Sequence, residues 1–387
     1  MVYFSTFVLD NNRGYVMLRK FKVSNFKCFK EDFSFDLSSP KAYTFHPECV
    51  RNGIIANAMI YGYNGCGKSN LGWAIFDIIE HLTDKMRVEF PYKHYTNAET
   101  GNPVATFEYE FFIGGKVVRY AYAKTDYKTL VSESFFIEDR ELMALDRSHG
   151  NTTFTCLLKG TENLNKEIKD NSLSVLKYVK NNSVLANDDD NRIFLEFFLF
   201  VEHMLFFRSL QDRFYIGLET KKGTLNDEII KRGKVKDFED FLNQANVKCK
   251  LDVVNVMGEK QIAFYFGKKK ILLQEIVSTG TDSLMLFYCW YLQILSGEVS
   301  FVFIDEFDAF YHHELSNLII RKLKETGTQF IVTTHNTSVM TNDLMRPDCY
   351  FLMDNRKILP LSECTEKELR EAHNIEKIYK AGAFHVE

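Results

Sequence analysis

A phosphate-binding pattern, G-x-x-x-x-G-K-S, is present at residues 62–69. Glycines in such a turn let backbone N–H groups curl around phosphate oxygens, while the dipole of the following helix points at the anion. Lys68 is expected to neutralise the β- and γ-phosphates, and Ser69 is expected to ligate Mg2+. The predicted nucleotide contacts in this turn are Gly62, Asn64, Gly65, Cys66, Gly67, Lys68, Ser69 and Asn70.

A second chemical group is a pair of acids, Asp305 and Glu306, after an apolar run. The run Phe301–Ile304 is typical of a buried central strand, so the two acids are predicted at its carboxyl end. Beside a phosphate-binding turn, Asp305 is expected to hold Mg2+ through its water shell, and Glu306 is expected to polarise the attacking water. The alternative is an acidic turn after a strand, without chemistry.

The segments around these motifs must bring them together. Ala58–Tyr61 is predicted to be a short buried strand, and apolar residues in 71–82 recur as on one face of an amphipathic helix, so the phosphate-binding turn lies between a strand and a helix. Alternation of apolar and polar residues over Leu18–Phe35 predicts an antiparallel strand pair. The stretch 105–123 predicts two more strands, joined by a turn of two glycines.

The middle of the chain is predicted to be helical and rich in aromatic residues. Residues 193–207 read IFLEFFLFVEHMLFF, and we predict a helical insertion, or lid, over 166–246. The acidic run 188–190 within it is predicted to be a solvated turn and helix start rather than a metal site. Buried strands at 299–304 and 329–334 then form the second half of an α/β core.

More than half of the chain lies between Lys68 and Asp305, so a large segment is inserted between the two halves of the core. This arrangement resembles the SMC/RecF-like branch of the ABC ATPases, whose two lobes flank an inserted arm or lid. The resemblance implies an α/β fold: an ABC-ATPase head with an antiparallel β subdomain, a parallel-sheet P-loop core and a helical insertion. It implies an N-terminal half at 17–165, an insertion at 166–246 and a C-terminal half at 247–387.

The start of the next predicted helix, Ser278-Thr279-Gly280-Thr281, resembles a degenerate form of the ABC signature. A hydroxyl at a helix N-terminus can bind a γ-phosphate. In this family that helix end faces the nucleotide of a second protomer, so the resemblance implies a homodimer or higher homo-oligomer. The alternative is a plain helix N-cap by Ser278 or Thr281. The sequence lacks the fuller Leu-Ser-Gly-Gly form of the signature. ATP hydrolysis is therefore expected to be slow, with bound ATP acting chiefly to hold the oligomer together.

The segment Thr333–Asn336 follows an apolar strand and resembles the switch-histidine segment of the same family. The resemblance implies that His335 senses the γ-phosphate and helps to hold the water; a purely structural histidine is the alternative. Asp308 lies where the D-loop of such proteins communicates between protomers. The adjacent His312 and His313 are not predicted to bind a metal, because neighbouring side chains on a helix diverge.

The segments 21–29, 238–256 and 335–352 are similar to stand-alone bacterial "AAA family ATPases", small SMC/RecF-like proteins of abortive-infection and anti-phage systems. Those proteins resemble the ATPase half of OLD-family nucleases and the ATPase component of PARIS and Septu systems. The resemblance implies an ATPase that forms homo-oligomers, acts with a separately encoded effector (a nuclease or toxin) and responds to a phage-derived trigger. The tail after His335 has no acidic cluster suited to a Toprim nuclease, so intrinsic DNA cleavage is not expected.

Two other functions stay open. A DNA-repair or recombination ATPase of the RecF type would clamp DNA, and a nucleotide-locked scaffold would hold a toxin and release it. The net charge of −4 argues against a chain-wide DNA-binding surface. The lysine-rich stretches 221–236 and 268–270 are the local support for DNA, and a solvated face explains them as well.

Composition sets the remaining expectations. The 387 residues are 45% hydrophobic and 26% charged, which is enough for one large core or two moderate ones. The eight cysteines have no metal-ligand spacing, so reduced thiols in a cytoplasmic protein are expected. No apolar run approaches the roughly 18 to 20 residues of a membrane span, so no membrane partner is expected. Residues 1–16 are interpreted as an extension before a fresh start at Met17, without a function.

Overall fold

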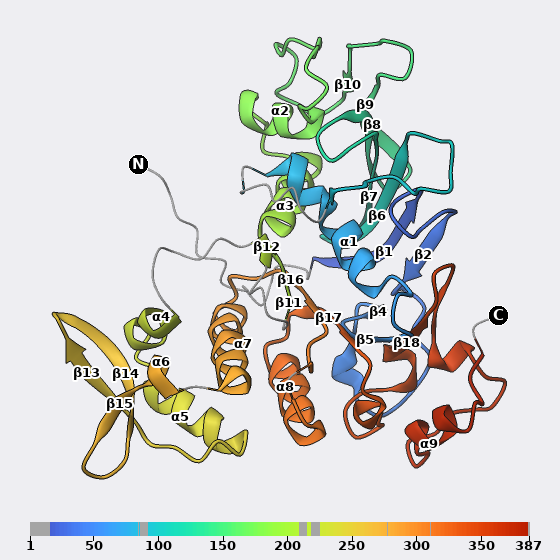
Figure 1. Cartoon of the computed structure of the whole chain (residues 1–387). Coiled ribbons are helices and arrows are strands. Elements are labelled where there is room, and N and C mark those ends of the chain that lie inside the picture. Colours follow the sequence, from blue (N-terminus) through green and yellow to red (C-terminus); the bar gives the residue numbers. More distant parts are fainter. Residues whose placement is uncertain are drawn as a thin grey trace.

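The computed structural model describes residues 16–83, 85, 92–208, 215–217, 225–276, 278–309 and 311–385. Within these residues, two large sheets lie one above the other, and a smaller unit lies beside the lower one (Figure 1). The predicted extension at 1–16 lies outside the described residues apart from Val16. None of the described helices is long and apolar enough to cross a membrane.

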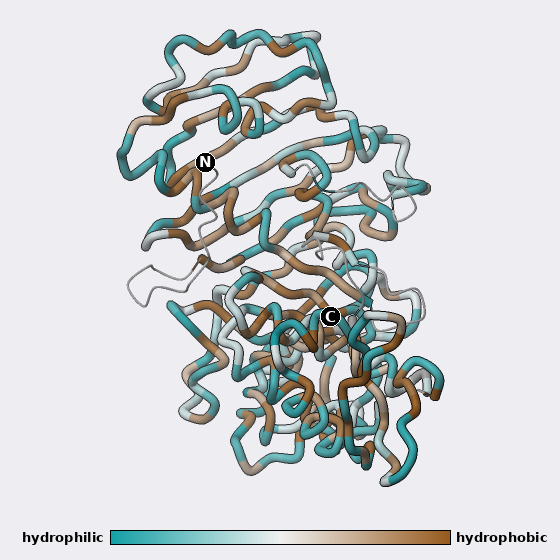
Figure 2. Tube along the Cα trace, turned by 90° about the vertical axis from the view of Figure 1, so that its left-hand side faces the viewer, coloured by the Kyte–Doolittle hydropathy of each residue, from teal (hydrophilic) through white to brown (hydrophobic). Residues whose placement is uncertain are grey.

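The upper sheet is antiparallel, with the strand order β10-β9-β8-β7-β6-β1-β2. Apolar and polar residues alternate along its strands (Figure 2), and the alternating burial of their side chains places the apolar ones on the covered face. The predicted strand pair at 18–35 and the strand pair at 105–123 are confirmed. The strands are Met17–Ser24 (β1), Phe33–Asp36 (β2), Ala105–Ile113 (β6), Lys116–Lys124 (β7), Leu130–Ile137 (β8), Arg140–Asp146 (β9) and Thr155–Cys156 (β10).

The lower sheet has the order β12-β11-β16-β17-β5-β18-β19, in which the five inner strands are parallel and the two edges antiparallel. Four inner strands are buried at every position, as expected for a parallel sheet covered on both faces. The buried strands predicted at 58–61, 299–304 and 329–334 are confirmed as β5, β16 and β17. The strands are Asn57–Tyr61 (β5), Met204–Arg208 (β11), Tyr215–Gly217 (β12), Phe301–Asp305 (β16), Gln329–Thr334 (β17), Tyr350–Met353 (β18) and Ile358–Pro360 (β19). An antiparallel sheet beside a parallel P-loop sheet confirms the predicted mixed α/β class.

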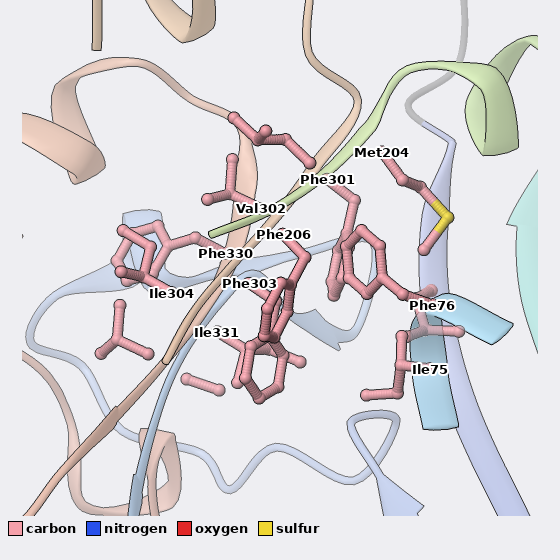
Figure 3. Packing of buried hydrophobic residues seen from close by; sticks show 14 of the residues in the cluster. Ile75, Phe76, Met204, Phe206, Phe301, Val302, Phe303, Ile304, Phe330 and Ile331 are labelled. Atoms are coloured by element: carbon pink, nitrogen blue, oxygen red, sulfur yellow. The ribbon is translucent and has the colours of Figure 1, made fainter. Parts of the chain in front are cut away.

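Helix α1 (Lys68–Leu82) lies between the two sheets and packs on β16, β11 and α3 (Asp189–Glu202). Aromatic rings from the helix and from the lower sheet meet in this core (Figure 3). The ring of Phe76 on α1 packs on Phe206 and Phe301, with centroids 5.6 and 6.0 Å away. The helix that begins at the phosphate-binding turn is therefore fixed by the core of the molecule.

The smaller unit is a three-stranded antiparallel sheet with short helices, at the lower left of Figure 1. Its strands are Leu251–Val256 (β13), Glu259–Tyr265 (β14) and Lys270–Leu272 (β15), and its helices are Leu225–Lys231 (α4), Val235–Gln244 (α5) and Leu273–Ile276 (α6). The next helix along the chain, α7, contacts α4 and α5, so it joins this unit to the lower sheet. The other elements are Thr279–Leu295 (α7), His313–Glu325 (α8), Val175–Asn182 (α2), Ile375–Lys380 (α9), and the hairpin of Val50–Arg51 (β3) and Ile54–Ile55 (β4).

The helical insertion predicted over 166–246 is only partly helical. Helices α2, α3, α4 and α5 are present, and the acidic run 188–190 is a helix start, because Asp188 caps α3 by accepting from the backbone N–H of Asn191. The prediction is wrong at Met204–Arg208, which forms β11 inside the parallel sheet. Helix α3 ends at Glu202, and the apolar residues that follow can serve a buried strand as well as a helix.

Candidate functional site

The phosphate-binding turn runs from the carboxyl end of β5 to the first residue of α1. Gly65 and Gly67 have left-handed φ angles of 80° and 102°, which glycine adopts without strain. A Cβ atom on Gly62 would lie 2.5 Å from the carbonyl oxygen of Met353, and one on Gly67 would lie 2.6 Å from the Cys28 sulfur. Other residues would distort this cradle, so the glycines fit a turn that wraps an anion with backbone N–H groups.

Lys68 is buried at the start of α1, and its ammonium lies over the turn. Its Nζ donates to the carbonyl oxygens of Gly62 at 2.8 Å and Tyr63 at 3.1 Å. Burial lowers the pKa of Lys68, while the thiol of Cys66 and the nearby carboxylates of Asp305 and Glu306 oppose that shift. The lysine therefore lies within electrostatic range of Asp305, the predicted metal ligand, and of Glu306, the predicted catalytic carboxylate.

Asp305 is the last residue of β16, and its carboxylate is completely buried. Thr333 at the end of β17 donates its hydroxyl to Oδ1 at 2.8 Å. The other oxygen, Oδ2, has no aligned hydrogen bond. A buried carboxylate oxygen without an aligned hydrogen bond is a chemical fit for the water shell of Mg2+, which prefers oxygen ligands. Ser69, half-buried beside the lysine on the turn, supplies the hydroxyl expected of a direct ligand.

Glu306 follows the strand in a left-handed conformation, with φ of 50°. Its backbone N–H donates to the Thr333 hydroxyl at 2.8 Å, which fixes this unfavourable geometry. Burial raises the pKa of the Glu306 carboxyl, as does the charge of Asp305, while Arg208 and Lys68 oppose the rise. A carboxyl with a raised pKa next to a phosphate turn is suited to accept a proton from water.

His335 follows β17 and is near the phosphate-binding turn. Burial and the charge of Lys68 lower the pKa of His335, and its contact with the backbone of Gly62 opposes this. The imidazole is thus neutral at pH 7 and able to donate or accept a hydrogen bond. The preceding Thr334 donates its hydroxyl to both oxygens of Asp308 at 2.8 Å, which ties the predicted D-loop to the switch strand.

The predicted signature residues are at the start of α7 and outside the cluster around Lys68. Ser278 is exposed and caps the helix: its hydroxyl accepts from the backbone N–H of Thr281 at 3.3 Å and contacts the Thr281 hydroxyl at 3.1 Å. Gly280 is half-buried between them, and Thr279 is the first residue of the helix. Ser278 thus lies at the molecular surface, whereas Thr281 is buried.

Sequence reasoning missed Arg208, the last residue of β11. In the parallel ladder it pairs directly with Asp305, and its Nε lies 3.1 Å from Asp305 Oδ2. The signal was present, because the apolar run Met204–Phe207 ends in one cation, but that run was assigned to a helix. Among the described residues, no group of three or more histidine, cysteine or acidic side chains is arranged to hold a metal ion.

The carboxyl ends of β5, β11, β16 and β17 thus collect the phosphate-binding turn, a cation, two acids and a histidine at one edge of the parallel sheet. Together with the antiparallel upper sheet, this is a two-sheet α/β domain built around a phosphate-binding loop. A family model described as "AAA domain, putative AbiEii toxin, Type IV TA system" matches residues 58–341, and the chain belongs to this family. A search of curated proteins finds no significant match.

Solved structures of SMC heads are also similar to this chain. The SMC head domain from Thermotoga maritima is 15% identical, with a TM-score of 0.43, and the match covers 89% of this chain and 98% of that one. An SMC head bound to the C-terminal winged-helix domain of ScpA is 14% identical, with a TM-score of 0.47 and coverage of 90% and 99%. An Smc head with an extended coiled coil, bound to the C-terminal domain of ScpA derived from Pyrococcus furiosus, is 12% identical, with a TM-score of 0.46 and coverage of 90% and 97%.

Proposed function

We propose that the chain binds and hydrolyses ATP with Mg2+ at a site that a second copy completes, and that it is the sensor and scaffold ATPase of a bacterial anti-phage system. The observation that carries the ATPase part is the meeting of the glycine turn with Lys68, Asp305 and Glu306 at one sheet edge. A turn that binds phosphates, beside a buried acid for a metal and a second acid for water, is the arrangement that phosphoryl transfer to water requires.

In the proposed reaction, water attacks the γ-phosphorus, the bond to the β–γ bridging oxygen breaks, and ADP and phosphate leave. Glu306 orients the water and accepts its proton, and the neutral His335 holds the same water by a hydrogen bond. Lys68 neutralises the β- and γ-phosphates. Ser69 and the water shell around Asp305 would hold Mg2+, which when bound neutralises charge on the phosphate oxygens.

The second copy is expected to contribute Ser278, Thr279, Gly280 and Thr281. The exposure of Ser278 at this helix end supports this, because the positive end of a helix dipole attracts an anion. Within the described residues, the side-chain hydrogen bonds of Ser278 are made to Thr281, and none reaches the same chain's phosphate-binding turn. If the γ-phosphate is bound by the turn of one copy and by the helix end of the other, ATP would hold the two copies together.

The mass of Glu306→Gln protein with and without ATP and Mg2+ tests this proposal. Loss of the proton acceptor should trap ATP, so we expect a shift to a dimer or higher oligomer in light scattering only when nucleotide is present. Lys68→Ala should lose ATP binding and stay at the smaller mass, whereas the exposed substitution Glu366→Gln should behave like the wild type. A Glu306→Gln protein that stays monomeric and hydrolyses ATP normally would exclude the proposed site.

Mixing two inactive variants tests the sharing of the site directly. Lys68→Ala removes the phosphate grip, and Ser278→Arg blocks the helix end. A mixed dimer retains one intact site, made by the turn of the Ser278→Arg copy and the helix end of the Lys68→Ala copy. Random exchange in a two-fold dimer should restore roughly a quarter of the wild-type rate. No recovery under conditions where the copies exchange would show that each chain acts alone.

The defence role draws support from the description of the family, which names a toxin of a toxin–antitoxin system. A separately encoded nuclease or toxin is the proposed effector, and a phage product is the proposed trigger. Cells that express the chain with its genomic neighbours should resist a phage panel, and Lys68→Ala should abolish the resistance. Resistance that survives Lys68→Ala, or none against any phage, would contradict this role.

Binding of DNA in the manner of RecF is the second candidate. Its support is the β14–β15 hairpin, where Lys268 and Lys269 are exposed beside Phe266, a ring that is 60% exposed. Lysines with an exposed aromatic ring are suited to nucleic acid. A salt-dependent binding assay with duplex and single-stranded DNA separates the two candidates: affinity that falls steeply with salt, and falls again in Lys268→Glu/Lys269→Glu protein, would favour DNA.

A further inference from the structure

Arg208 and Asp305 are held side by side by the sheet itself. They are the last residues of two adjacent parallel strands and are direct partners in the ladder. The two backbones therefore bring the side chains to the same edge, and Arg208 Nε lies 3.1 Å from Asp305 Oδ2. Among the described residues, Arg208 is the one cation within ion-pair distance of this carboxylate.

The Arg208–Asp305 contact is within ion-pair distance, but its atoms are poorly aligned for a hydrogen bond. Neither Arg208 Nε nor Asp305 Oδ2 has an aligned hydrogen-bond partner, although both atoms are buried. The other carboxylate oxygen is fixed by the Thr333 hydroxyl, so the carboxylate cannot turn to improve the contact. The arginine thus provides charge without the fork-like pairing that makes Arg–carboxylate pairs strong.

A buried carboxylate without a counter-charge is costly, so the arginine stabilises the site before a metal arrives. Lys68 is engaged with the carbonyl oxygens of the phosphate-binding turn. Resting on the proposed nucleotide site, we infer that Arg208 is a positioning residue that occupies Oδ2 of Asp305 and would compete with a divalent cation for this carboxylate. The Arg208 side chain is 26% exposed, so part of it already meets solvent at this edge of the sheet.

Competition predicts that a neutral residue at position 208 tightens metal binding. The experiment measures the Kd of Mn2+ in the presence of AMP-PNP, from the electron paramagnetic resonance signal of free Mn2+. Arg208→Gln should lower that Kd by about three- to tenfold, which corresponds to roughly 0.7 to 1.4 kcal/mol of lost competition. Arg208→Met is a second neutral variant with the same expected direction. Arg208→Lys keeps the charge and should leave the Kd close to the wild-type value.

Arg232→Gln is the matched control. Arg232 is 25% exposed, pairs with Glu228 and Glu298 and donates to the Leu292 carbonyl oxygen, so the substitution removes a partly exposed arginine and its ion pairs away from the phosphate-binding turn. Its Mn2+ affinity should be unchanged. An unchanged or weaker affinity in folded Arg208→Gln or Arg208→Met protein would overturn the inference, as would a gain in Arg208→Lys equal to that of the neutral variants. Failure of the wild type to bind AMP-PNP is distinguishable, because it would overturn the nucleotide site and the inference with it.

Discussion

Gly72, in the first turns of α1, tests how tightly the phosphate-binding helix is fixed to the sheet. A Cβ atom at this position would lie 2.6 Å from the Phe206 ring of β11 and 2.8 Å from the Phe303 ring of β16. Those two rings are fully buried and stack on each other with centroids 5.6 Å apart. Figure 3 shows both among the residues of this core. Gly72→Ala therefore inserts a methyl group where neither neighbour is a flexible chain end.

Two opposing contributions set the change in the free energy of unfolding that we expect for Gly72→Ala. Carbon atoms in contact are normally about 3.5 to 4.0 Å apart, so both rings would have to move by several tenths of an ångström or more. Overpacking of a filled core costs about 1 to 3 kcal/mol, and two buried rings put Gly72→Ala near the upper end. Alanine in place of glycine in a helix contributes up to about 1 kcal/mol in the opposite direction. We expect a net loss of about 2 kcal/mol.

Urea unfolding of wild-type and Gly72→Ala protein measures this loss as a lower midpoint at constant slope. Gly101→Ala is the matched control, because no atom lies within 4 Å of its added methyl group. Phe206→Leu should cost stability alone yet relieve Gly72→Ala in the double variant, giving a favourable coupling energy. A Gly72→Ala protein as stable as the wild type, or a double variant with additive losses, would refute the packing argument.

Three further predictions concern the polar groups around the site. Thr333→Val removes the hydroxyl that bonds Asp305 and a neighbouring backbone N–H; we expect a loss of about 1 to 3 kcal/mol in urea unfolding and a lower kcat, with Thr333→Ser close to the wild type. Lys124→Met leaves the buried carboxylate of Asp77 without its ion-pair partner at 2.7 Å and should lower the free energy of unfolding by about 3 to 5 kcal/mol. The double variant Lys124→Met/Asp77→Leu should regain much of that loss. A double variant that is as unstable as Lys124→Met, or less stable still, would contradict the argument. Burial and a nearby lysine lower the pKa of His335 below the ordinary 6.5. As the pH drops, His335 is therefore protonated in the unfolded chain before it is protonated in the folded chain. The free energy of unfolding of the wild type should then decrease as the pH falls from about 6.5 through the lowered pKa. In thermal unfolding between pH 8 and 5.5, His335→Gln should show a smaller decrease.

The sequence was informative wherever one local pattern had one structural solution. The glycine turn needs a strand before it and a helix after it, and both β5 and α1 are present. The short apolar run that ends in Asp305 predicted an inner strand, and β16 is buried at every position. The strand pairs of the upper sheet followed from alternation, because one of their faces meets the core and the other meets water.

The sequence was not informative where neighbours decide the structure. The apolar residues of 193–207 are compatible with one long helix, and tertiary contacts divide them into α3 and β11. That error hid Arg208, since a residue on a predicted helix has no reason to meet Asp305. Thr333 was placed in the right segment, but its double role as donor to Asp305 and acceptor from Glu306 depends on the register of β16 with β17.

Charge balance links the arginine to the proposed shared site. At the sheet edge, the cations Lys68 and Arg208 face the carboxylates Asp305 and Glu306, so the cluster is close to neutral. A triphosphate brings several negative charges to such a cluster, which cannot balance them by itself. A divalent cation that replaces Arg208 on Asp305 adds positive charge and frees the guanidinium. The N-terminal end of α7 in a second copy adds more, because the helix dipole is positive at that end. Binding of nucleotide, metal and partner should therefore be mutually reinforcing, and Mn2+ affinity should rise when the protein is concentrated enough to dimerise.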